Sequence, residues 1–314
     1  MTQVSVIVLT YNPNNTRLRQ TLSAIAAQKN ISFEIIISDD GSAKKDFAFL
    51  PAYMQMLGVQ NYQLLEHQEN RGTVRSCLSA VTAAQGEYVF LTSPGDFLFD
   101  PYVLQDFYCF AKENHAPMCF GNAVFYCAQN DQPKITRLYG SPASPQLFNP
   151  GNALDKLAFF GGTWVIGASY FRSRALMLDC LNQICDTATY MEDTPTTAFA
   201  LAKGETLSYY DRNIVWYEDG SGISTGASEA WKKRLHKDAL QSFAKLKHQY
   251  PVDPYVDIAF SNLSESNKLI RILKKFLRHP VLSIRMICNK NAPKKEIVYT
   301  KADLQRLTQL LKIE

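Results

Sequence analysis

The chain has 314 residues, of which 46% are apolar and 20% are charged, and its 15 glycines and 14 prolines are spread along it. This composition excludes a disordered, collagen-like or coiled-coil protein, and the length suffices for one large α/β domain or two modest ones. The seven cysteines contain no C-x-x-C pair, which argues against a zinc site or disulfide framework and favours a reducing compartment. No apolar run reaches the roughly 18 residues of a membrane span, and no signal peptide is evident, so we expect a location inside the cell.

Strands and helices alternate along the first 115 residues. Continuous apolar, β-branched runs predict strands that are covered on both faces of a parallel sheet. The helix after the first strand has Asn14, Asn15 or Thr16 as its N-cap, and another is predicted to start at Asp100-Pro101. The alternation predicts an α/β fold with a doubly wound sheet. The predicted strands cover residues 4–9, 34–38, 62–65 and 87–91.

Residues 116–225 have a mixed pattern. A strand is predicted near 118–126, and helices are predicted after Ser173, from Glu192 to Gly204 and after Ser228. The glycine-rich, polar segment 216–224 is typical of a mobile loop that closes over a ligand.

Three of the predicted strands end in polar clusters, at residues 10–12, 39–40 and 93–96. Ligands of doubly wound sheets bind beyond the carboxyl ends of the strands, so these clusters mark the candidate site. Neither G-x-G-x-x-G nor the P-loop motif is present, which removes the phosphate cradle of dinucleotide oxidoreductases and P-loop NTPases. Carboxylates at this edge suit hydrogen bonds from a base or ribose, or a Mg²⁺ or Mn²⁺ ion on phosphates.

The motifs VSVIVLTYN (residues 4–12), EIIISDDGS (34–42) and GEYV (86–89), with Met191-Glu192-Asp193 further on, resemble family 2 glycosyltransferases of the GT-A fold. The resemblance implies a Rossmann-like, doubly wound mixed sheet with a helical C-terminal extension. It also implies a catalytic domain over residues 1–225, with a nucleotide-binding half at 1–115 and an acceptor-binding half at 116–225. Residues 226–314 are then the helical, basic extension.

The resemblance gives the first half of the chain a nucleotide-sugar site. Asp40 would accept a hydrogen bond from the base, Thr10 and Tyr11 would wall the base pocket, and Arg71 would lie near base or phosphates. Two alternatives without a binding role stay open. The acidic pair at 39–40 would form an ordinary strand-to-helix turn, and Arg71 would be a solvated charge on a loop.

Residues 93–96 occupy the place of the family's metal-binding acidic motif but depart from it. Ser93 and Gly95 replace acids, and only Asp96 keeps a carboxylate. One carboxylate with diphosphate oxygens and waters still suits Mn²⁺ or Mg²⁺, so we expect a weak metal site that needs the donor. The alternative is that Asp96 only caps a turn.

Asp193 is the candidate general base, which would take the proton of the acceptor hydroxyl, and Glu192 is its alternative. Asp193 also suits a helix N-cap before Thr194-Pro195, a purely structural role. Trp164 is a candidate platform for an acceptor sugar, with core packing as the other interpretation.

Together these features predict an inverting, metal-assisted glycosyltransferase that moves a sugar from a nucleotide donor, with UDP favoured, to a glycan or lipid-linked acceptor in cell-surface polysaccharide synthesis. The competing hypothesis is a non-catalytic nucleotide-sugar-binding or scaffold protein with a decayed metal motif. A related nucleotidyltransferase is disfavoured, because residues 10–15 lack the basic side chains that would grip phosphates.

The net charge of +4 conceals a basic tail: residues 268–295 hold nine lysines and arginines and no acid. Within it, residues 268–278 have the pattern of a basic amphipathic helix. We expect it to bind an anionic membrane surface on the inner face of the plasma membrane, and packing on the catalytic domain or on a second copy is the alternative. Nucleic acid is not expected as a partner, since no groove-reading motif accompanies the charge. A homo-oligomer stays open.

Overall fold

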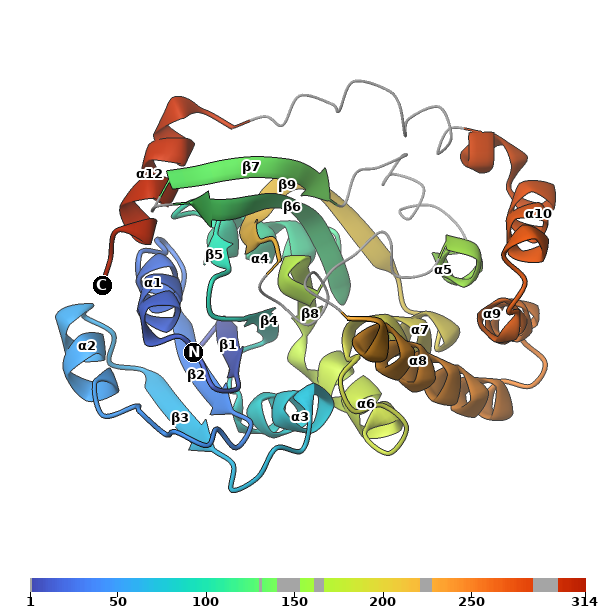
Figure 1. Ribbon diagram of the computed structural model, residues 1–314, viewed down its shortest axis with the longest axis horizontal. Helices are drawn as coiled ribbons and strands as arrows, with labels where there is room; N and C mark the ends of the chain where they lie inside the picture. The colour runs from blue at the N-terminus through green and yellow to red at the C-terminus, as the bar shows by residue number, and fades with distance from the viewer. Residues whose placement is uncertain (1, 130–131, 140–152, 161–166, 221–227, 285–298) are drawn as a thin grey trace.

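The computed structural model describes the chain except for residues 1, 130–131, 140–152, 161–166, 221–227 and 285–298 (Figure 1). The described strands form one mixed sheet in the order β3-β2-β1-β4-β8-β6-β9-β5, and β7 pairs with β6. The strands are β1 (Val4–Thr10), β2 (Phe33–Asp39), β3 (Tyr62–Glu66), β4 (Tyr88–Thr92), β5 (Phe97–Leu98), β6 (Met118–Gln129), β7 (Gln132–Tyr139), β8 (Tyr170–Ser173) and β9 (Leu207–Glu218).

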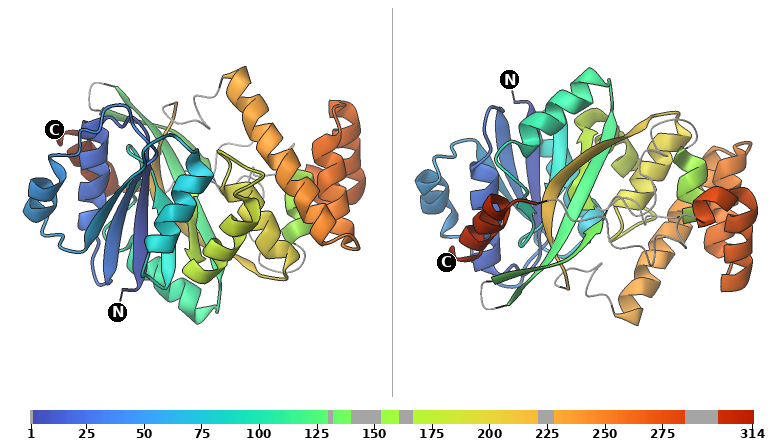
Figure 2. Two further views of the ribbon diagram at one scale, coloured as in Figure 1. Left: turned by 90° about the horizontal axis from the view of Figure 1, so that it is seen from below. Right: turned by 90° about the horizontal axis from the view of Figure 1, so that it is seen from above.

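Helices cover both faces of this sheet, which gives the fold its α/β class (Figure 2). They are α1 (Asn15–Ala26), α2 (Leu50–Met56), α3 (Thr73–Ala83), α4 (Val103–Glu113), α5 (Ala153–Phe160), α6 (Arg174–Ile184), α7 (Asp193–Ala202), α8 (Glu229–Gln249), α9 (Pro254–Ser264), α10 (Lys268–Arg278) and α12 (Lys301–Leu311). Among the described residues, no helix is both long and apolar enough to cross a bilayer.

The parallel half of the sheet brings the predicted polar clusters to one edge. Thr10 at the end of β1 lies beside Asp39 at the end of β2, and Val8 of β1 lies beside Thr92 at the end of β4. The strands β1, β2 and β4 confirm the prediction, because their apolar side chains pack on both faces of the sheet. In β1, for example, Val6 and Ile7 are fully buried on opposite sides. The carboxyl ends of β1, β2 and β4 therefore frame one site.

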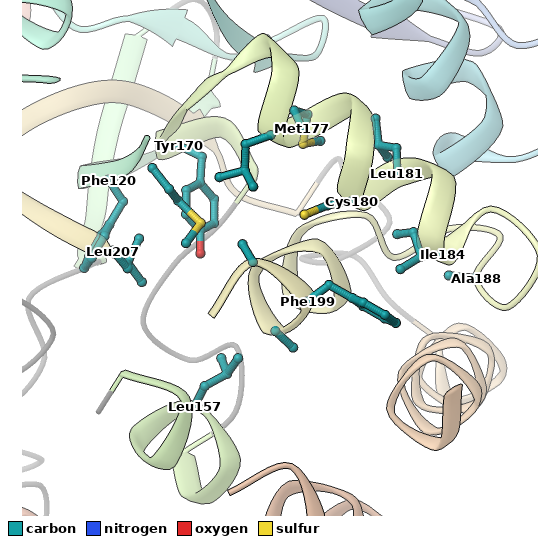
Figure 3. Close-up of a cluster of buried hydrophobic side chains, with 14 of the residues drawn as sticks. Phe120, Leu157, Tyr170, Met177, Cys180, Leu181, Ile184, Ala188, Phe199 and Leu207 are labelled. Atoms are coloured by element: carbon teal, nitrogen blue, oxygen red, sulfur yellow. The ribbon is translucent and has the colours of Figure 1, made fainter. Parts of the chain in front are cut away.

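The two largest hydrophobic clusters of the described residues flank the sheet. One lies between the sheet and helices α3 and α5–α9, and Figure 3 shows Leu181 of α6 and Phe199 of α7 turned into it. The other lies under α1, α2 and α4 and also receives Leu307 and Leu311 of α12. The C-terminal helix thus packs beside α1, where the side-chain amide of Gln20 donates to the carbonyl oxygen of Leu311 (3.1 Å) (Figure 1).

Two local expectations are wrong. The helix predicted to start at Asp100 begins at Val103, because the Asp100 carboxylate accepts the N–H of Tyr102 (2.7 Å) and pairs with Arg212. Residues 216–218, expected in a mobile loop, form the end of β9. Trp216 is fully buried there, and its indole N–H donates to the carbonyl oxygen of Phe99 (3.1 Å). The rest of that predicted loop, from residue 221, lies outside the described residues.

Other predicted helix starts are confirmed in detail. The side chains of Asn14, Ser173 and Ser228 cap α1, α6 and α8 by accepting backbone N–H groups of the first turn. The helix expected at Glu192 is α7, which begins at Asp193 and ends before Gly204.

Candidate functional site

The two carboxylates at the end of β2, Asp39 and Asp40, are both buried but bind different partners. Asp39 is fully buried and accepts both the N–H (2.9 Å) and the hydroxyl of Ser42, which fixes the turn. Asp40 extends to the neighbouring loop, where Oδ1 accepts the N–H of Arg71 (3.0 Å) and Oδ2 accepts the N–H of Gly72 (2.9 Å). Each carboxylate oxygen has a further lone pair, so Asp40 can also accept from a ligand.

The residues after β1 form one wall of this site. The Thr10 hydroxyl is buried and finds no hydrogen-bond partner among the described residues, while its carbonyl oxygen accepts the N–H of Asp40 (2.9 Å). Tyr11 is 53% exposed, so its ring offers a free surface for stacking. Asn12 holds the turn through its N–H, which donates to Ser42 Oγ (2.6 Å).

Arg71 is partly buried and is not a solvated loop charge. Its Nη2 lies 2.7 Å from Nδ1 of His67 and 3.3 Å from the hydroxyl of Ser79. Burial lowers the pKa of His67, and the adjacent guanidinium lowers it further. Neutral His67 can therefore accept a hydrogen bond from the Arg71 guanidinium and fix its position.

The turn after β4 carries Asp96 inward and leaves Ser93 exposed. The N–H of Asp96 donates to the carbonyl oxygen of Ser93 (3.0 Å), and Asp96 Oδ1 accepts the N–H of Glu218 from β9 (3.1 Å). Gly95 has a φ of +101°, and a Cβ there would overlap the Glu218 carboxylate. The second carboxylate of this corner thus comes from β9, and it fills the space beside Gly95.

Two carboxylates meet at this corner, and each is held in a low-exposure position. Burial, and then the charge of Glu218, raise the pKa of Asp96 well above its usual range. Arg17 of α1 pairs with Glu218 (2.7 Å), which balances one of the two negative charges. Within the described part of the chain, no cluster of three or more His, Cys, Asp or Glu side chains is arranged to hold a metal ion. The pair of carboxylates fits an ion that takes its other ligands from a diphosphate and water.

Glu192 and Asp193 lie at the start of α7. Glu192 is the N-cap residue, and Asp193 Oδ1 accepts the N–H of Thr194 (2.6 Å). Burial, and then the neighbouring carboxylate, raise the pKa of Glu192 to about 7, and burial also raises that of Asp193. Arg172 of β8 is 3% exposed and opposes both shifts with its positive charge. A carboxylate with a raised pKa is a better proton acceptor, as a general base must be.

Asp238 of α8 fixes the segment that leads to this pair. Its Oδ2 accepts the N–H groups of Thr189 (2.9 Å), Tyr190 (2.7 Å) and Met191 (3.2 Å). The side chain is 6% exposed, so these bonds satisfy a buried charge. The three bonds set the direction in which residues 192–193 leave the loop.

The segment 189–191 also contacts the loop of Arg71 and Gly72, whose N–H groups bind Asp40. The N–H of Val74 donates to the carbonyl oxygen of Thr189 (3.0 Å), and Gly72 packs so closely on Thr189 that a Cβ would overlap it. Gly72 also has a φ of +87°, which favours glycine. Contacts therefore run without a break from Asp40 through Gly72 and Thr189 to the residues before Asp193.

The sequence interpretation missed three contributors, Glu218, Arg172 and Asp238. The sequence analysis assigned Glu218 to a loop. The signal for its true position is the acidic pair at 218–219 directly after an apolar run, a pattern typical of the end of a strand. Arg172 and Asp238 become visible only through the pairing of distant elements. Trp164, the proposed acceptor platform, lies outside the described residues.

Known proteins resemble this chain in sequence and in fold. The sequence model described as glycosyl transferase family 2 matches residues 5–191. A search of curated protein sequences finds no match to the chain.

Among solved structures, residues 1–349 of Staphylococcus aureus TarS in complex with UDP-GlcNAc superpose with a TM-score of 0.62 at 17% identity, over 91% of this chain and 79% of that one. The mannosyltransferase PcManGT of Pyrobaculum calidifontis, in complex with GDP-Man and Mn²⁺, gives a TM-score of 0.57 at 16% identity, over 98% and 84%. At such low identity, these likenesses concern the fold.

Proposed function

Because the chain belongs to glycosyl transferase family 2 and has its GT-A fold, we propose that it transfers a sugar, with inversion, from a UDP-sugar to a glycan or lipid-linked acceptor in cell-surface polysaccharide synthesis. The observation that carries the proposal is the unbroken set of contacts from Asp40 to the segment before Asp193. These contacts support one site in which Asp40 binds the base and Asp193 accepts the proton. TarS and PcManGT, solved with UDP-GlcNAc and GDP-Man, support the choice of a nucleotide-sugar donor.

In the donor half, Asp40 accepts from the nucleotide base, and the exposed Tyr11 ring stacks on it. The unsatisfied Thr10 hydroxyl supplies a further hydrogen bond to the donor, which relieves the cost of its burial. Arg71, held by His67, provides a positive charge toward the phosphates. These roles extend the predicted ones and rest on the geometry around the ends of β1 and β2.

In the chemical step, the acceptor hydroxyl oxygen attacks the anomeric carbon while its proton passes to Asp193. We assign the proton to Oδ2, since Oδ1 already accepts the N–H of Thr194. The bond from the anomeric carbon to the diphosphate oxygen breaks, and the diphosphate leaves with the electron pair. Attack on the face opposite the leaving group inverts the configuration.

A divalent ion, Mn²⁺ or Mg²⁺, fits the corner between β4 and β9. Asp96 would hold it, and Glu218 supplies the second carboxylate that the motif lacks at Gly95. When bound, such an ion neutralises the charge that develops on the leaving diphosphate. PcManGT, which was solved with Mn²⁺, supports this proposal.

The reaction is proposed to take place inside the cell. The described cysteines, Cys77, Cys109, Cys119, Cys127, Cys180 and Cys185, are all free thiols, in keeping with a reducing compartment.

The test is donor binding and turnover in the same preparation. Wild-type protein, Asp193→Asn and Asp40→Asn are titrated with UDP-sugars in the presence of Mn²⁺, and release of UDP is followed. Asp193→Asn should bind the donor as the wild type does but release no UDP, while Asp40→Asn should lose binding. Full binding without turnover in the wild type, with and without candidate acceptors, would favour the scaffold hypothesis.

A further inference from the structure

Helix α10 turns its apolar face away from the protein. Its apolar side chains are exposed, with Leu269 at 75%, Leu273 at 57% and Leu277 at 72%. No residue of the helix is buried. A surface helix of a globular protein normally places this face on the core, so α10 has the reverse orientation.

The basic side chains of α10 lie on the other side, toward the protein. Lys274 reaches Ser261 (3.4 Å) and Glu265 (4.0 Å) of the preceding segment, and Arg278 pairs with Asp155 of α5 (3.4 Å). Burial lowers the pKa of Lys275. These contacts attach the helix by its polar side, and within the described residues they leave its apolar face exposed.

The apolar surface continues beyond the helix. Residues 280–284 are helical again, and Val281 (63% exposed) and Ile284 (49% exposed) extend the patch, while Leu282 turns into the core. We call this patch the α10 surface; its members are Leu269, Ile270, Ile272, Leu273, Phe276, Leu277, Val281 and Ile284. A contiguous exposed apolar patch of this kind marks an interaction site.

We propose that the α10 surface docks on an anionic lipid bilayer, with the helix lying in the plane of the interface. The five cations of α10, Lys268, Arg271, Lys274, Lys275 and Arg278, are accompanied by no acid within the helix. Lys268 and Arg278, at its two ends, are exposed. Apolar side chains between exposed cations match the acyl boundary and the headgroups of an anionic membrane.

A second copy of the chain is a poorer partner for this surface. A twofold dimer would place the same patch on both sides of the contact, and would bring the exposed cations at the helix ends, Lys268 and Arg278, of both copies into one interface. Like charges at an interface oppose association. An anionic bilayer instead attracts the exposed cations at the two ends of the helix, Lys268 and Arg278.

The position of α10 suits an acceptor that is held in the membrane. Helix α10 packs on α5, and α5 packs on α7, which begins at the proposed base Asp193. In Figures 1 and 2, α10 lies at the end of the molecule opposite α2 and β3. The inference of a lipid-linked acceptor rests on the proposed function, whereas lipid binding itself does not.

The test is co-sedimentation of the full chain with phosphatidylcholine vesicles and with vesicles that also contain phosphatidylglycerol. The variant Leu269→Gln/Leu273→Gln/Leu277→Gln removes the apolar stripe without adding charge. Met56→Gln is the matched control, because Met56 is 69% exposed but lies on α2. Thermal melting and binding of UDP-sugar without vesicles report on the fold and on the donor site separately.

The wild type should sediment with the anionic vesicles more than with the neutral ones, and less as salt is raised. The triple variant should bind at least about tenfold more weakly, and Met56→Gln should bind as the wild type does. Absence of vesicle binding by the wild type, or equal binding by the folded triple variant, would overturn the inference. So would a lipid-free dimer that the triple variant converts to a monomer.

Discussion

The carboxylate of Glu218, at the end of β9, occupies the space that a side chain on residue 95 would need. The N–H of Glu218 also donates to Asp96 (3.1 Å), so strand β9 and the turn after β4 form one corner. The sequence around residue 95 reads as a metal motif that has lost an acid. In the proposed metal site, Glu218 supplies this acid from the other side of the corner.

This relationship predicts the effect of a single methyl group. Gly95→Ala should displace the Glu218 side chain and strain the backbone, whose φ is +101°. The cost in the free energy of unfolding should be about 1–3 kcal/mol, measured by urea denaturation. Gly204→Ala is the control, because Gly204 has a similar φ of +91° and a Cβ there would meet no atom within 4 Å. If both variants lose the same stability, the displacement of Glu218 contributes nothing.

Removing the charge of Glu218 should separate metal binding from donor binding. Glu218→Gln keeps the shape of the side chain but leaves Asp96 as the lone carboxylate of the corner. We expect Mn²⁺ to stabilise the donor complex of the wild type, and this increment in melting temperature to shrink in the variant. Donor binding without metal should stay the same, since Asp40 is untouched. An unchanged Mn²⁺ increment would exclude Glu218 from the site.

Asp238 should act as a positioning residue. Asp238→Ala removes the acceptor of three N–H groups, so residues 192–193 should lose their fixed direction. We expect kcat to fall at least about tenfold, with the KM for the donor nearly unchanged, because Asp40 does not contact Asp238. Asp238→Asn keeps an oxygen acceptor and should recover part of kcat. Equal losses of kcat in both variants, with KM raised, would point to general unfolding.

The raised pKa values of the acidic pair predict the pH dependence. The base must be deprotonated to act, so kcat should rise with pH through a limb that lies above the ordinary range of a carboxyl group. Burial is the largest cause of the raised pKa of Asp193, so Glu192→Gln should leave this limb above the ordinary range. A wild-type limb near pH 4 would contradict the assignment.

The same pKa shift has a consequence for stability. A carboxyl whose pKa is raised on folding favours the folded state below its ordinary pKa, and this advantage is lost as pH rises toward 7. Glu192→Gln should therefore gain stability relative to the wild type at pH 8, on the order of 1–3 kcal/mol, and little at pH 4. Urea denaturation at both values checks the sign.

The first half of the fold could be predicted because its signals are local. The strands β1, β2 and β4 are continuous apolar runs, and their polar ends fall at one edge by the rule of parallel sheets. Some helix starts in the second half were predictable for the same reason, since the caps at Ser173 and Ser228, like that at Asn14, depend on single residues next to the helix start. Such features need no knowledge of distant contacts.

The second half was harder because its elements are defined by pairing. Residues 216–218 look like a loop until β9 pairs with β6, about ninety positions earlier in the chain. Asp238 stands among basic residues on α8, and only the packing of α8 on α7 brings it to the 189–191 segment. Glycine and acid content alone could not distinguish these roles.

The most direct test of the account is the thermal stability of the full chain with UDP-, dTDP-, GDP- and CMP-sugars, each with and without Mn²⁺. A ligand at 100 times its dissociation constant adds about 2.7 kcal/mol. The account predicts a Mn²⁺-dependent rise in melting temperature with UDP-sugars that Asp40→Asn abolishes and Asp193→Asn retains. No rise with any donor, or a rise that survives Asp40→Asn, would contradict it.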